Sequence, residues 1–275
     1  MFAERQTSLA QYEEYDLLLT DDFIVGACRL DETVGESLTA RSERIYDMLF
    51  QIIEKHDYPH ILRTWNIIED INRDQDGLER YRQFCLGRYE SFQNHRPDLA
   101  GRYPAASAVG AGSGGLLVYF IAAKTPGTPV ENPNQVSAFN YPSQYGPRSP
   151  SFSRALVREW QGTRPDGGNA NLYISGTASI SGHQTRHAGD LVAQVDQTID
   201  NLEALASEAG RISGNDFKLR KSDSLMKGYV RNPDDLPTIQ EAVTRRLGAD
   251  TTVLFLRADV CRAALLVEID GVLSA

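Results

Sequence analysis

Residues 265–273, LLVEIDGVL, repeat the apolar pattern of residues 116–124, LLVYFIAAK, and this pair of segments decides the fold. Before each segment the chain carries the same expected series of strands, a long helix, a strand, an acidic turn and a shorter helix. A series that occurs twice indicates two copies of one structural unit. We therefore expect an α/β (α+β) protein of two similar units, each a mixed β-sheet with two helices on one face.

The first unit is expected to occupy residues 1–129. Its first fifteen residues are polar and acidic, and we expect them to form a frayed leader. In the remainder, apolar periodicity distinguishes helices from strands. The expected strands lie within residues 17–30, at 60–68, after Pro104 and at 116–124, and the expected helices run from Leu38 to about His56 and from Leu78 to about Phe92.

The second unit is expected to occupy residues 130–275. A glycine-rich stretch at 161–171 is expected to form a surface loop, and Gly210 is expected to end the long helix. The other expected elements are strands at 172–180, 224–230, 251–260 and 265–273 and helices at 191–209 and 238–247. Two helices cover only one face of a sheet, so the other face must be covered by the partner unit or by another subunit.

The composition is that of an acidic globular protein. The chain has 275 residues, a net charge of -9 and 41% hydrophobic residues. This charge is unfavourable for nonspecific binding to nucleic acid or to an anionic membrane, so we expect neither partner. No apolar run reaches spanning length and the three cysteines have no metal-binding spacing, which predicts a cytoplasmic protein without a metal. The oligomeric state stays open.

Residues 138–155, AFNYPSQYGPRSPSFSRA, form a segment that we name the Arg/Tyr loop. Its three prolines exclude a helix and predict a stiff loop. Arg148 and Arg154 are expected to bind a carboxylate, because guanidinium groups pair with carboxylates through parallel hydrogen bonds. Tyr141 and Tyr145 are expected to add hydroxyl donors. The alternative is a linker between domains whose arginines face water.

The second unit resembles the RidA (YjgF) family in three blocks, YISGTASI (173–180), GDLVAQVDQTIDNLEALASEAG (189–210) and RADVCRAALLVEIDGV (257–272). The first unit is a fainter copy of the same pattern. The resemblance implies two tandem RidA/YjgF-like (chorismate-mutase-like) domains with a site between them. RidA imine deaminases carry an arginine at a place that falls at or near Val253 here, and near Ala106 in the first unit, which disfavours imine deamination.

Five blocks in order resemble the chorismatase family more closely. They are RTWNIIEDIN (63–72), GLERYRQFCLGRYESF (77–92), ENPNQVSAFNYPSQYGPRSPSFSRA (131–155), ISGTASISGHQTRHAGD (174–190) and LRADVCRAALLVEID (256–270). The resemblance implies an enzyme of secondary metabolism that releases pyruvate from chorismate without a metal or an organic cofactor. The second product is either a dihydroxycyclohexadienoate or 3-hydroxybenzoate.

The resemblance assigns the role of catalytic acid to Glu268. Loss of pyruvate requires a proton on the methylene carbon of chorismate, and a desolvated carboxylic acid can supply it near neutral pH. Alternation along LLVEIDGVL places Glu268 and Asp270 on one face, which we expect to turn toward the joint between the units. The alternative is an exposed glutamate on an open sheet.

Further substrate contacts are expected from Arg257 and from the SGTAS block. Arg257 can instead be a surface residue at a strand end. Thr177 and Ser179 can touch the ring hydroxyl or satisfy backbone groups. His183 and His187 follow the same strand, where histidines are more often structural or exposed than catalytic.

Gly176 and Cys261 indicate the product subtype. The chorismatase resemblance implies that members forming 3-hydroxybenzoate pair this glycine with a cysteine seven residues before the catalytic glutamate, and Cys261 stands there. A thiol at this position could assist proton removal, so Cys261 is expected to be catalytic together with Glu268, and a small residue such as Gly176 could give the ring room to rearrange. The alternative for Cys261 is a small buried apolar residue, which is common for a free cysteine. A hydrolytic chorismatase, a RidA-like imine deaminase and a noncatalytic binding protein remain as alternatives.

Overall fold

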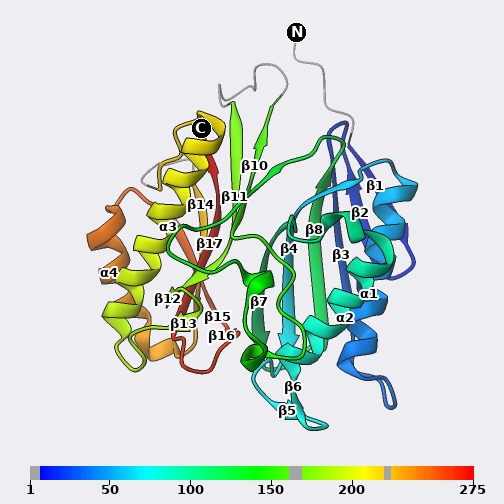
Figure 1. Ribbon diagram of the computed structural model, residues 1–275, viewed down its shortest axis with the longest axis horizontal. Coiled ribbons are helices and arrows are strands. Elements are labelled where there is room, and N and C mark those ends of the chain that lie inside the picture. The colour runs from blue at the N-terminus through cyan, green and yellow to red at the C-terminus, as the bar shows by residue number, and fades with distance from the viewer. Residues whose placement is uncertain (1–6, 161–168, 220–223) are drawn as a thin grey trace.

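The computed structural model describes residues 7–160, 169–219 and 224–275. Two sheets lie face to face at the centre of the molecule, and a pair of helices covers the outer side of each (Figure 1). The expected α/β class and the two helices on one face of each sheet are therefore confirmed. Parts of the expected leader and of the loop at 161–171, namely residues 1–6 and 161–168, lie outside the described residues.

The sheet of the first unit has the strand order β1-β2-β3-β8-β4-β7-β16. It is mixed, because β4 is parallel to β7 and antiparallel to β8. The strands are β1 (Ser8–Tyr12), β2 (Tyr15–Leu19), β3 (Phe23–Leu30), β4 (His60–Glu69), β7 (Ala105–Ala111), β8 (Leu116–Ala123) and β16 (Asp259–Val260). The helices are α1 (Leu38–Lys55) and α2 (Arg80–His95), and a short hairpin of β5 (Asp74–Gln75) and β6 (Leu78–Glu79) precedes α2.

The sheet of the second unit has the order β15-β14-β17-β11-β10-β9. Only the pair of β14 and β15 is parallel among its described strands. The strands are β9 (Thr128–Val130), β10 (Ala155–Glu159), β11 (Ala170–Ala178), β14 (Leu225–Val230), β15 (Val253–Arg257) and β17 (Val267–Ser274). The helices are α3 (Leu191–Ser213) and α4 (Leu236–Leu247), and β12 (Ile180–Ser181) forms a hairpin with β13 (Gln184–Thr185).

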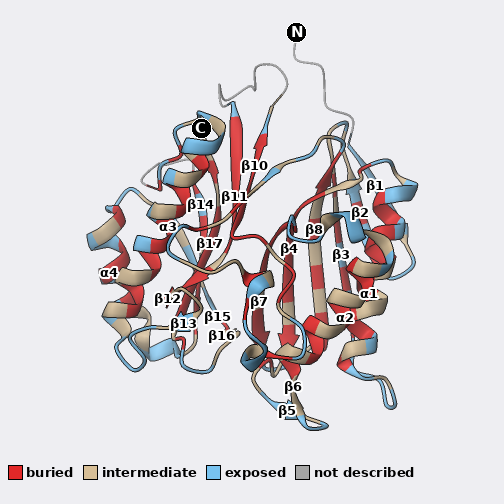
Figure 2. Cartoon of the chain, in the orientation of Figure 1, coloured by how far each residue is buried: buried red, intermediate tan, exposed pale blue. Residues whose placement is uncertain are grey.

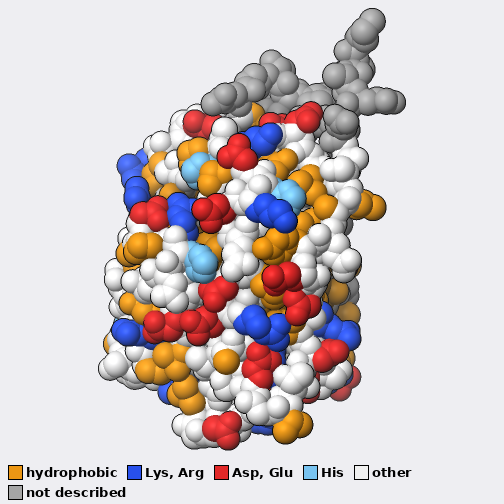
Figure 3. All heavy atoms as spheres, turned by 90° about the vertical axis from the view of Figure 1, so that its right-hand side faces the viewer, with side chains coloured by type: hydrophobic (Ala, Val, Ile, Leu, Met, Phe, Trp, Pro, Cys, Tyr) orange, Lys and Arg blue, Asp and Glu red, His pale blue; other side chains and the backbone are white. Residues whose placement is uncertain are grey.

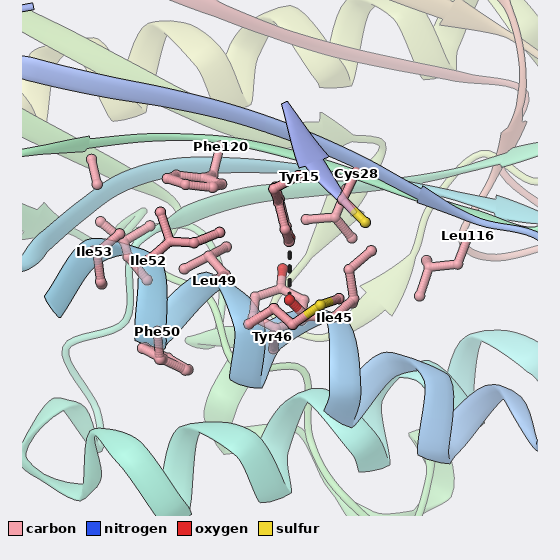
Figure 4. Close-up of a cluster of buried hydrophobic side chains, with 14 of the residues drawn as sticks. Tyr15, Cys28, Ile45, Tyr46, Leu49, Phe50, Ile52, Ile53, Leu116 and Phe120 are labelled. Carbon is pink, nitrogen blue, oxygen red and sulfur yellow. Dashed lines mark hydrogen bonds between the residues drawn. The ribbon is translucent and has the colours of Figure 1, made fainter. Parts of the chain in front are cut away.

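The core of the first unit lies between its sheet and α1. The hydroxyl oxygen of Ser37 accepts a hydrogen bond from the Ala40 amide at 3.1 Å, which caps the first turn of the helix. Apolar side chains recur along the buried face of α1 and pack against the sheet (Figure 4). Among them, the Tyr15 hydroxyl donates to the Ile45 carbonyl at 3.2 Å, so this phenol is buried with its polar atom satisfied.

Four differences from the expectation bear on the fold, beyond shifts of a few residues at other element ends. Residues 8–12 form the edge strand β1, and its mostly exposed side chains explain why apolar alternation did not reveal it. The second helix begins at Arg80 rather than Leu78, because residues 78–79 form β6. The long helix α3 passes Gly210 and ends at Gly214, whose φ of 72° terminates it.

The fourth difference concerns residues 251–260, which do not form a single strand. β15 pairs with β14 in the second sheet, whereas β16 pairs with β7 at the edge of the first sheet. One continuous piece of chain therefore contributes to both sheets. The predicted unit boundary at residues 129 and 130 stays a prediction, and β9, which spans it, belongs to the second sheet.

The inner faces of the two sheets cover each other. Buried residues continue through both central layers (Figure 2). An apolar cluster joins residues of the two units across the joint, namely Leu62, Ala105, Ala123, Leu156 and Tyr173. Of the two expected ways to cover the second face of each sheet, the partner unit is therefore the one found at this joint.

The surface beside α1 carries acidic and basic side chains next to one another rather than a patch of one sign (Figure 3). This mixture gives that face no concentrated positive potential for a polyanion. Every described helix is too short or too polar to cross a membrane.

Candidate active site

Glu268 lies on the central strand β17, with Ala178 of β11 on one side and Tyr229 of β14 on the other. Its side chain is 3% exposed and faces the joint between the two sheets. Its Oε1 atom has no hydrogen-bond partner among the described residues. A buried carboxyl group without a partner is costly when charged, so this position favours the neutral acid.

Gly176 gives Glu268 the room that it occupies. A β-carbon at position 176 would lie 2.6 Å from Cδ of Glu268 and 3.1 Å from Oγ of Ser107, and still closer to Oε1 of Glu268. The register of β11 against β17 shifts between Ile174 and Thr177, so the strand is irregular at this glycine. The carboxyl group therefore lies directly over a backbone that carries no side chain.

A cavity of about 410 Å³ opens beside Glu268 between the two units. This volume lies within the range of about 300 to 1,000 Å³ that is usual for small-ligand sites. Its walls are Glu79, Tyr81, Arg82, Tyr141, Gln144, Tyr145, Pro150, Phe152, Arg154, Gly176, Ala178, Ile180, Cys261, Arg262, Ala263 and Glu268. The cavity thus combines a buried acid, three arginines and several aromatic rings.

A recess of about 30 Å³ adjoins the cavity behind Glu268. Six residues line both spaces: Tyr81, Pro150, Phe152, Gly176, Cys261 and Glu268. The recess adds Asn66, Phe84, Cys85, Arg88, Ala106, Ser107, Ala108 and Ser151. Since both units contribute to it, the predicted position of the site between the units agrees with this geometry.

The environment raises the pKa of Glu268 to about 8. The main cause is burial, and the negative charge of Asp270 adds to it. The positive charges of Arg63 and Arg154 act in the opposite direction. Glu268 is therefore largely protonated at neutral pH, as a general acid must be.

Asp270 lies two residues farther along β17 and is fully buried. Its Oδ2 atom accepts hydrogen bonds from Trp65 at 3.0 Å, Ser107 at 2.7 Å and Tyr229 at 2.9 Å. Nη2 of Arg63 donates to the same oxygen at 2.9 Å in a buried ion pair. Donors from both units therefore meet at one carboxylate.

Arg154 is 4% exposed and lines the cavity. Its Nη2 atom donates to the Val136 carbonyl at 2.8 Å and to the Tyr141 hydroxyl at 2.6 Å. Its Nε atom has no hydrogen-bond partner in the part of the chain that the structure describes. The structure thus brings the predicted Arg154 and Tyr141 together at the cavity wall with donor capacity left over.

Tyr145 also lines the cavity, and it links the Arg/Tyr loop to the β12–β13 hairpin. Its hydroxyl donates to the His183 carbonyl at 2.7 Å and lies 3.1 Å from Nδ1 of the same residue. The Arg262 guanidinium lies over the Tyr145 ring at 4.2 Å and donates to the His183 carbonyl at 2.9 Å. His183 therefore supports one wall, and the exposed His187 has φ of 55° at a turn.

Arg148 and Arg257 do not reach the cavity. The Arg148 side chain is 49% exposed and lies against Tyr89 and Glu90 of α2. Arg257 is exposed on the edge strand β15. The expected contact of these arginines with substrate is therefore not supported, because the loop directs Arg148 outward and β15 lies at the sheet edge.

Thr177 and Ser179 are buried but serve the backbone. The Thr177 hydroxyl donates to the Ser175 carbonyl at 2.9 Å, and the Ser179 hydroxyl donates to the Arg186 carbonyl at 3.0 Å. Neither residue lines the cavity. Of the two roles considered for them, satisfaction of backbone groups is the one that the structure contains.

The sequence reasoning missed Arg88 and Tyr81 of α2. Arg88 is 3% exposed and lines the recess, and one of its Nη atoms donates to the Ser151 carbonyl of the Arg/Tyr loop. Its Nε atom has no hydrogen-bond partner among the described side chains and backbone. The signal was present, because Tyr81, Cys85 and Arg88 recur at helical spacing and so share one face of α2.

Cys261 is half-buried and lines both spaces with Glu268. Burial raises the pKa of its thiol to about 12, and the charge of Glu268 acts in the same direction. The side chain is therefore a neutral thiol at physiological pH. Its position beside Gly176 and Glu268 brings together the three residues on which the expected product subtype depends.

Comparisons with known proteins agree with this architecture. A family model described as "Chorismatase FkbO/Hyg5-like, N-terminal" matches residues 2–122. A 3-hydroxybenzoate synthase of Streptomyces hygroscopicus is 37% identical over 239 residues, which cover 85% of this chain and 69% of that protein. A chorismatase of Streptomyces rapamycinicus is 38% identical over 260 residues, which cover 93% of this chain and 75% of that protein.

A solved chorismatase structure gives a consistent result. A chorismatase crystal structure matches with a TM-score of 0.86 and 35% identity, covering 96% of this chain and 78% of that one. RidA from an Antarctic Psychrobacter covers 46% of this chain at 19% identity, with a TM-score of 0.35.

The fold and the site define a class of α/β proteins in which two sheet units enclose a buried acid in the cavity between them. This chain belongs to the chorismatase family. The resemblance drawn from the five sequence blocks is therefore confirmed.

Proposed function

We propose that this protein is a chorismatase that converts chorismate to pyruvate and 3-hydroxybenzoate. The observation that carries the proposal is Glu268, a buried acid with a pKa of about 8 at the wall of a cavity of ligand size. The names of the two Streptomyces relatives support both the substrate and the product. Chorismate is the small-molecule partner in this proposal.

Glu268 is proposed to protonate the methylene carbon of the enolpyruvyl group. Proton transfer to that carbon leaves an oxocarbenium-like centre and the carboxylate of Glu268. Cleavage of the ring C–O bond then releases pyruvate, and return of one ring proton to Glu268 gives the aromatic product and restores the acid. A carboxylic acid that remains protonated near pH 7 is suited to this step, and burial supplies that property here. The apolar and aromatic walls strengthen electrostatic interactions inside the cavity by excluding water.

The two carboxylates of chorismate are proposed to bind to Arg154 and Arg88. Both guanidinium groups are almost fully buried, and each keeps an Nε–H without a hydrogen-bond acceptor among the described residues. Tyr141 lines the cavity with Arg154, and Tyr81 lines the recess with Arg88, so each tyrosine can add a hydroxyl donor. Anion binding would satisfy these buried donors, which is favourable in a site of low dielectric.

The 3-hydroxybenzoate product is proposed on the combination of Gly176 and Cys261. Formation of 3-hydroxybenzoate consumes no water, whereas the alternative hydrolysis to a dihydroxycyclohexadienoate adds one molecule. Because Cys261 is a neutral thiol, we assign it a contact with the ring rather than the role of a strong base. Its replacement by alanine is expected to retain pyruvate release and to increase the share of the hydrolysis product.

The test is to incubate the purified protein with chorismate and to identify the products by mass. The expected products are pyruvate and 3-hydroxybenzoate. Glu268→Gln should abolish pyruvate release while chorismate binding remains measurable by calorimetry. Full turnover by this variant would exclude Glu268 as the acid.

We further propose a reducing cytoplasmic location, supported by the three free cysteines.

A further inference from the structure

The strand β17 carries two carboxyl groups that share one face but have different surroundings. Glu268 lines the cavity, and its Oε1 atom has no hydrogen-bond partner within the described ranges. Asp270 accepts four hydrogen bonds on Oδ2, one of them from the guanidinium of Arg63. Asp270 is thus held in an ion pair and a set of hydrogen bonds, whereas burial without a partner favours the neutral form of Glu268.

The donors to Asp270 come from both units. Arg63 and Trp65 lie on β4, and Ser107 lies on β7 of the first unit, whereas Tyr229 lies on β14 of the second. Lys227 adds a second positive charge, with Nζ 3.6 Å from Oδ1. This set of contacts fixes the negative charge of Asp270 in the joint.

Ser107 connects the two carboxyl environments. Its hydroxyl donates to Asp270 at 2.7 Å and accepts a hydrogen bond from Arg63. The same Oγ atom and the Glu268 carboxyl group both border the space over Gly176, and both line the recess. The Ser107 hydroxyl group therefore contacts the Asp270 carboxylate and also borders the space that the Glu268 carboxyl group occupies.

We propose that Asp270 is a positioning residue whose fixed negative charge keeps Glu268 in the protonated form required for proton delivery. The inference rests on the proposed role of Glu268 as the proton donor. The two carboxyl groups interact through space in water-excluded surroundings, where two adjacent negative charges are unfavourable. Because Oδ2 of Asp270 accepts four hydrogen bonds and pairs with Arg63, whereas Oε1 of Glu268 has no partner among the described residues, the proton is assigned to Glu268.

Other groups also face Glu268 and set its titration together with Asp270. Those close to it or lining the recess with it are Arg63, Tyr81, Cys85, Arg88, Arg154 and Cys261. Glu79, Arg82 and Arg262 line the wider cavity. Asp270 raises the pKa of Glu268, whereas Arg63 and Arg154 lower it. Removal of the Asp270 charge should therefore lower the pKa of Glu268.

The first experiment measures the ionisation of Glu268 directly in Asp270→Asn. Infrared difference spectroscopy detects the C=O stretch of a protonated carboxyl group, and its loss in Glu268→Gln assigns the band. The titration midpoint in Asp270→Asn should fall by about one pH unit or more. The alkaline limb of the kcat/KM profile for pyruvate release should move down by the same amount. An unchanged or higher midpoint would overturn the inference.

Asp270→Asn leaves Arg63 buried without its carboxylate partner, and this variant can fail to fold. The double variant Arg63→Gln/Asp270→Asn replaces the ion pair by two neutral amides. Its midpoint should also fall, but by less, because the effect of Asp270 on Glu268 exceeds that of Arg63. A midpoint equal to or above that of the unmodified protein in this soluble double variant contradicts the inference.

Tyr229→Phe is the matched control, since it removes one hydrogen bond to Asp270 without a change in charge. Its midpoint should stay close to that of the unmodified protein. A shift as large as that of Asp270→Asn would mean that altered packing, rather than charge, controls Glu268. If the infrared midpoint shifts as expected while the unmodified protein releases no pyruvate, the proposed function fails but the control of Glu268 by Asp270 stands.

Discussion

The carboxyl group of Glu268 fills the space in which residue 176 would carry a β-carbon. Cδ of Glu268 would lie 2.6 Å from that carbon, which is closer than nonbonded atoms approach. The carboxyl group can therefore occupy this position only while residue 176 is glycine. This relationship explains why a residue without a side chain lies in the middle of β11.

The first prediction is that Gly176→Ala retains the fold but loses activity. The nearest atoms belong to the end of a side chain that can rotate, so the protein can accommodate the methyl group by moving the carboxyl group. A displacement of about 1 Å at a catalytic group can cost on the order of 100-fold in rate. We expect a fall in kcat of this order with a melting temperature close to that of the unmodified protein. Unchanged kcat would show that the position of the carboxyl group is unimportant.

The second prediction concerns the pH dependence of catalysis. Since Glu268 must be protonated to act as an acid, activity should be high below its pKa and fall as the pH rises through about 8. The measurement is kcat/KM for pyruvate release between pH 6 and pH 10, chosen to bracket that value. A profile that rises continuously over this range would indicate a general base instead.

The third prediction concerns stability. The pKa of Glu268 is about 8 in the folded protein, compared with 4.5 for the unperturbed group. The folded state therefore binds more protons between these values, so the contribution of this residue to folding becomes less favourable as the pH rises through that window. At pH 8, the free energy of unfolding of Glu268→Gln should exceed that of the unmodified protein by on the order of a few kcal/mol. At pH 4 the variant should show no such gain.

Urea unfolding at both pH values tests this linkage. The control is Asp57→Asn, which changes an exposed carboxyl group far from the cavity. Its effect on unfolding should differ little between the two pH values. If the change in unfolding free energy caused by Glu268→Gln is the same at pH 4 and pH 8, the raised pKa of Glu268 is contradicted.

The fourth prediction compares three arginines. Arg88→Lys and Arg154→Lys keep the charge but lose the planar array of donors, and each should reduce kcat/KM by about 10-fold or more. Arg148→Ala is the comparison, because its side chain lies on the outer surface against α2. Steady-state kinetics with chorismate should show values near those of the unmodified protein for Arg148→Ala. A loss in Arg148→Ala equal to that of the other two variants would place Arg148 in the site.

The repeated pattern of apolar segments was sufficient to predict the architecture. The match of LLVYFIAAK to LLVEIDGVL reflects two central strands, β8 and β17, each packed against a pair of helices. Sequence did not reveal β1, because most of its residues are exposed and its place at the sheet edge imposes no apolar alternation. It also did not reveal the transfer of β16 to the other sheet, which depends on the packing of the two units.

The candidate site was predicted in part for similar reasons. The structure brings together three of the predicted residues, Glu268, Gly176 and Cys261, at the recess in the joint. Glu268 and Gly176 lie on the paired strands β17 and β11, and Cys261 follows β16. Arg154 lines the cavity and Arg148 faces outward because of the path of the Arg/Tyr loop, and local sequence does not determine that path. Arg88 was missed because an arginine in a helix is usually assigned to the solvent-facing side.

The passage of one chain segment from β15 to β16 has a consequence for attempts to divide the protein. A fragment that ends at residue 129 would lack the strand that completes its sheet beside β7. Its polypeptide edge at β7 would then be open to pairing with other molecules, which promotes aggregation. Functional complementation from two separately produced pieces should therefore require that they fold in each other's presence.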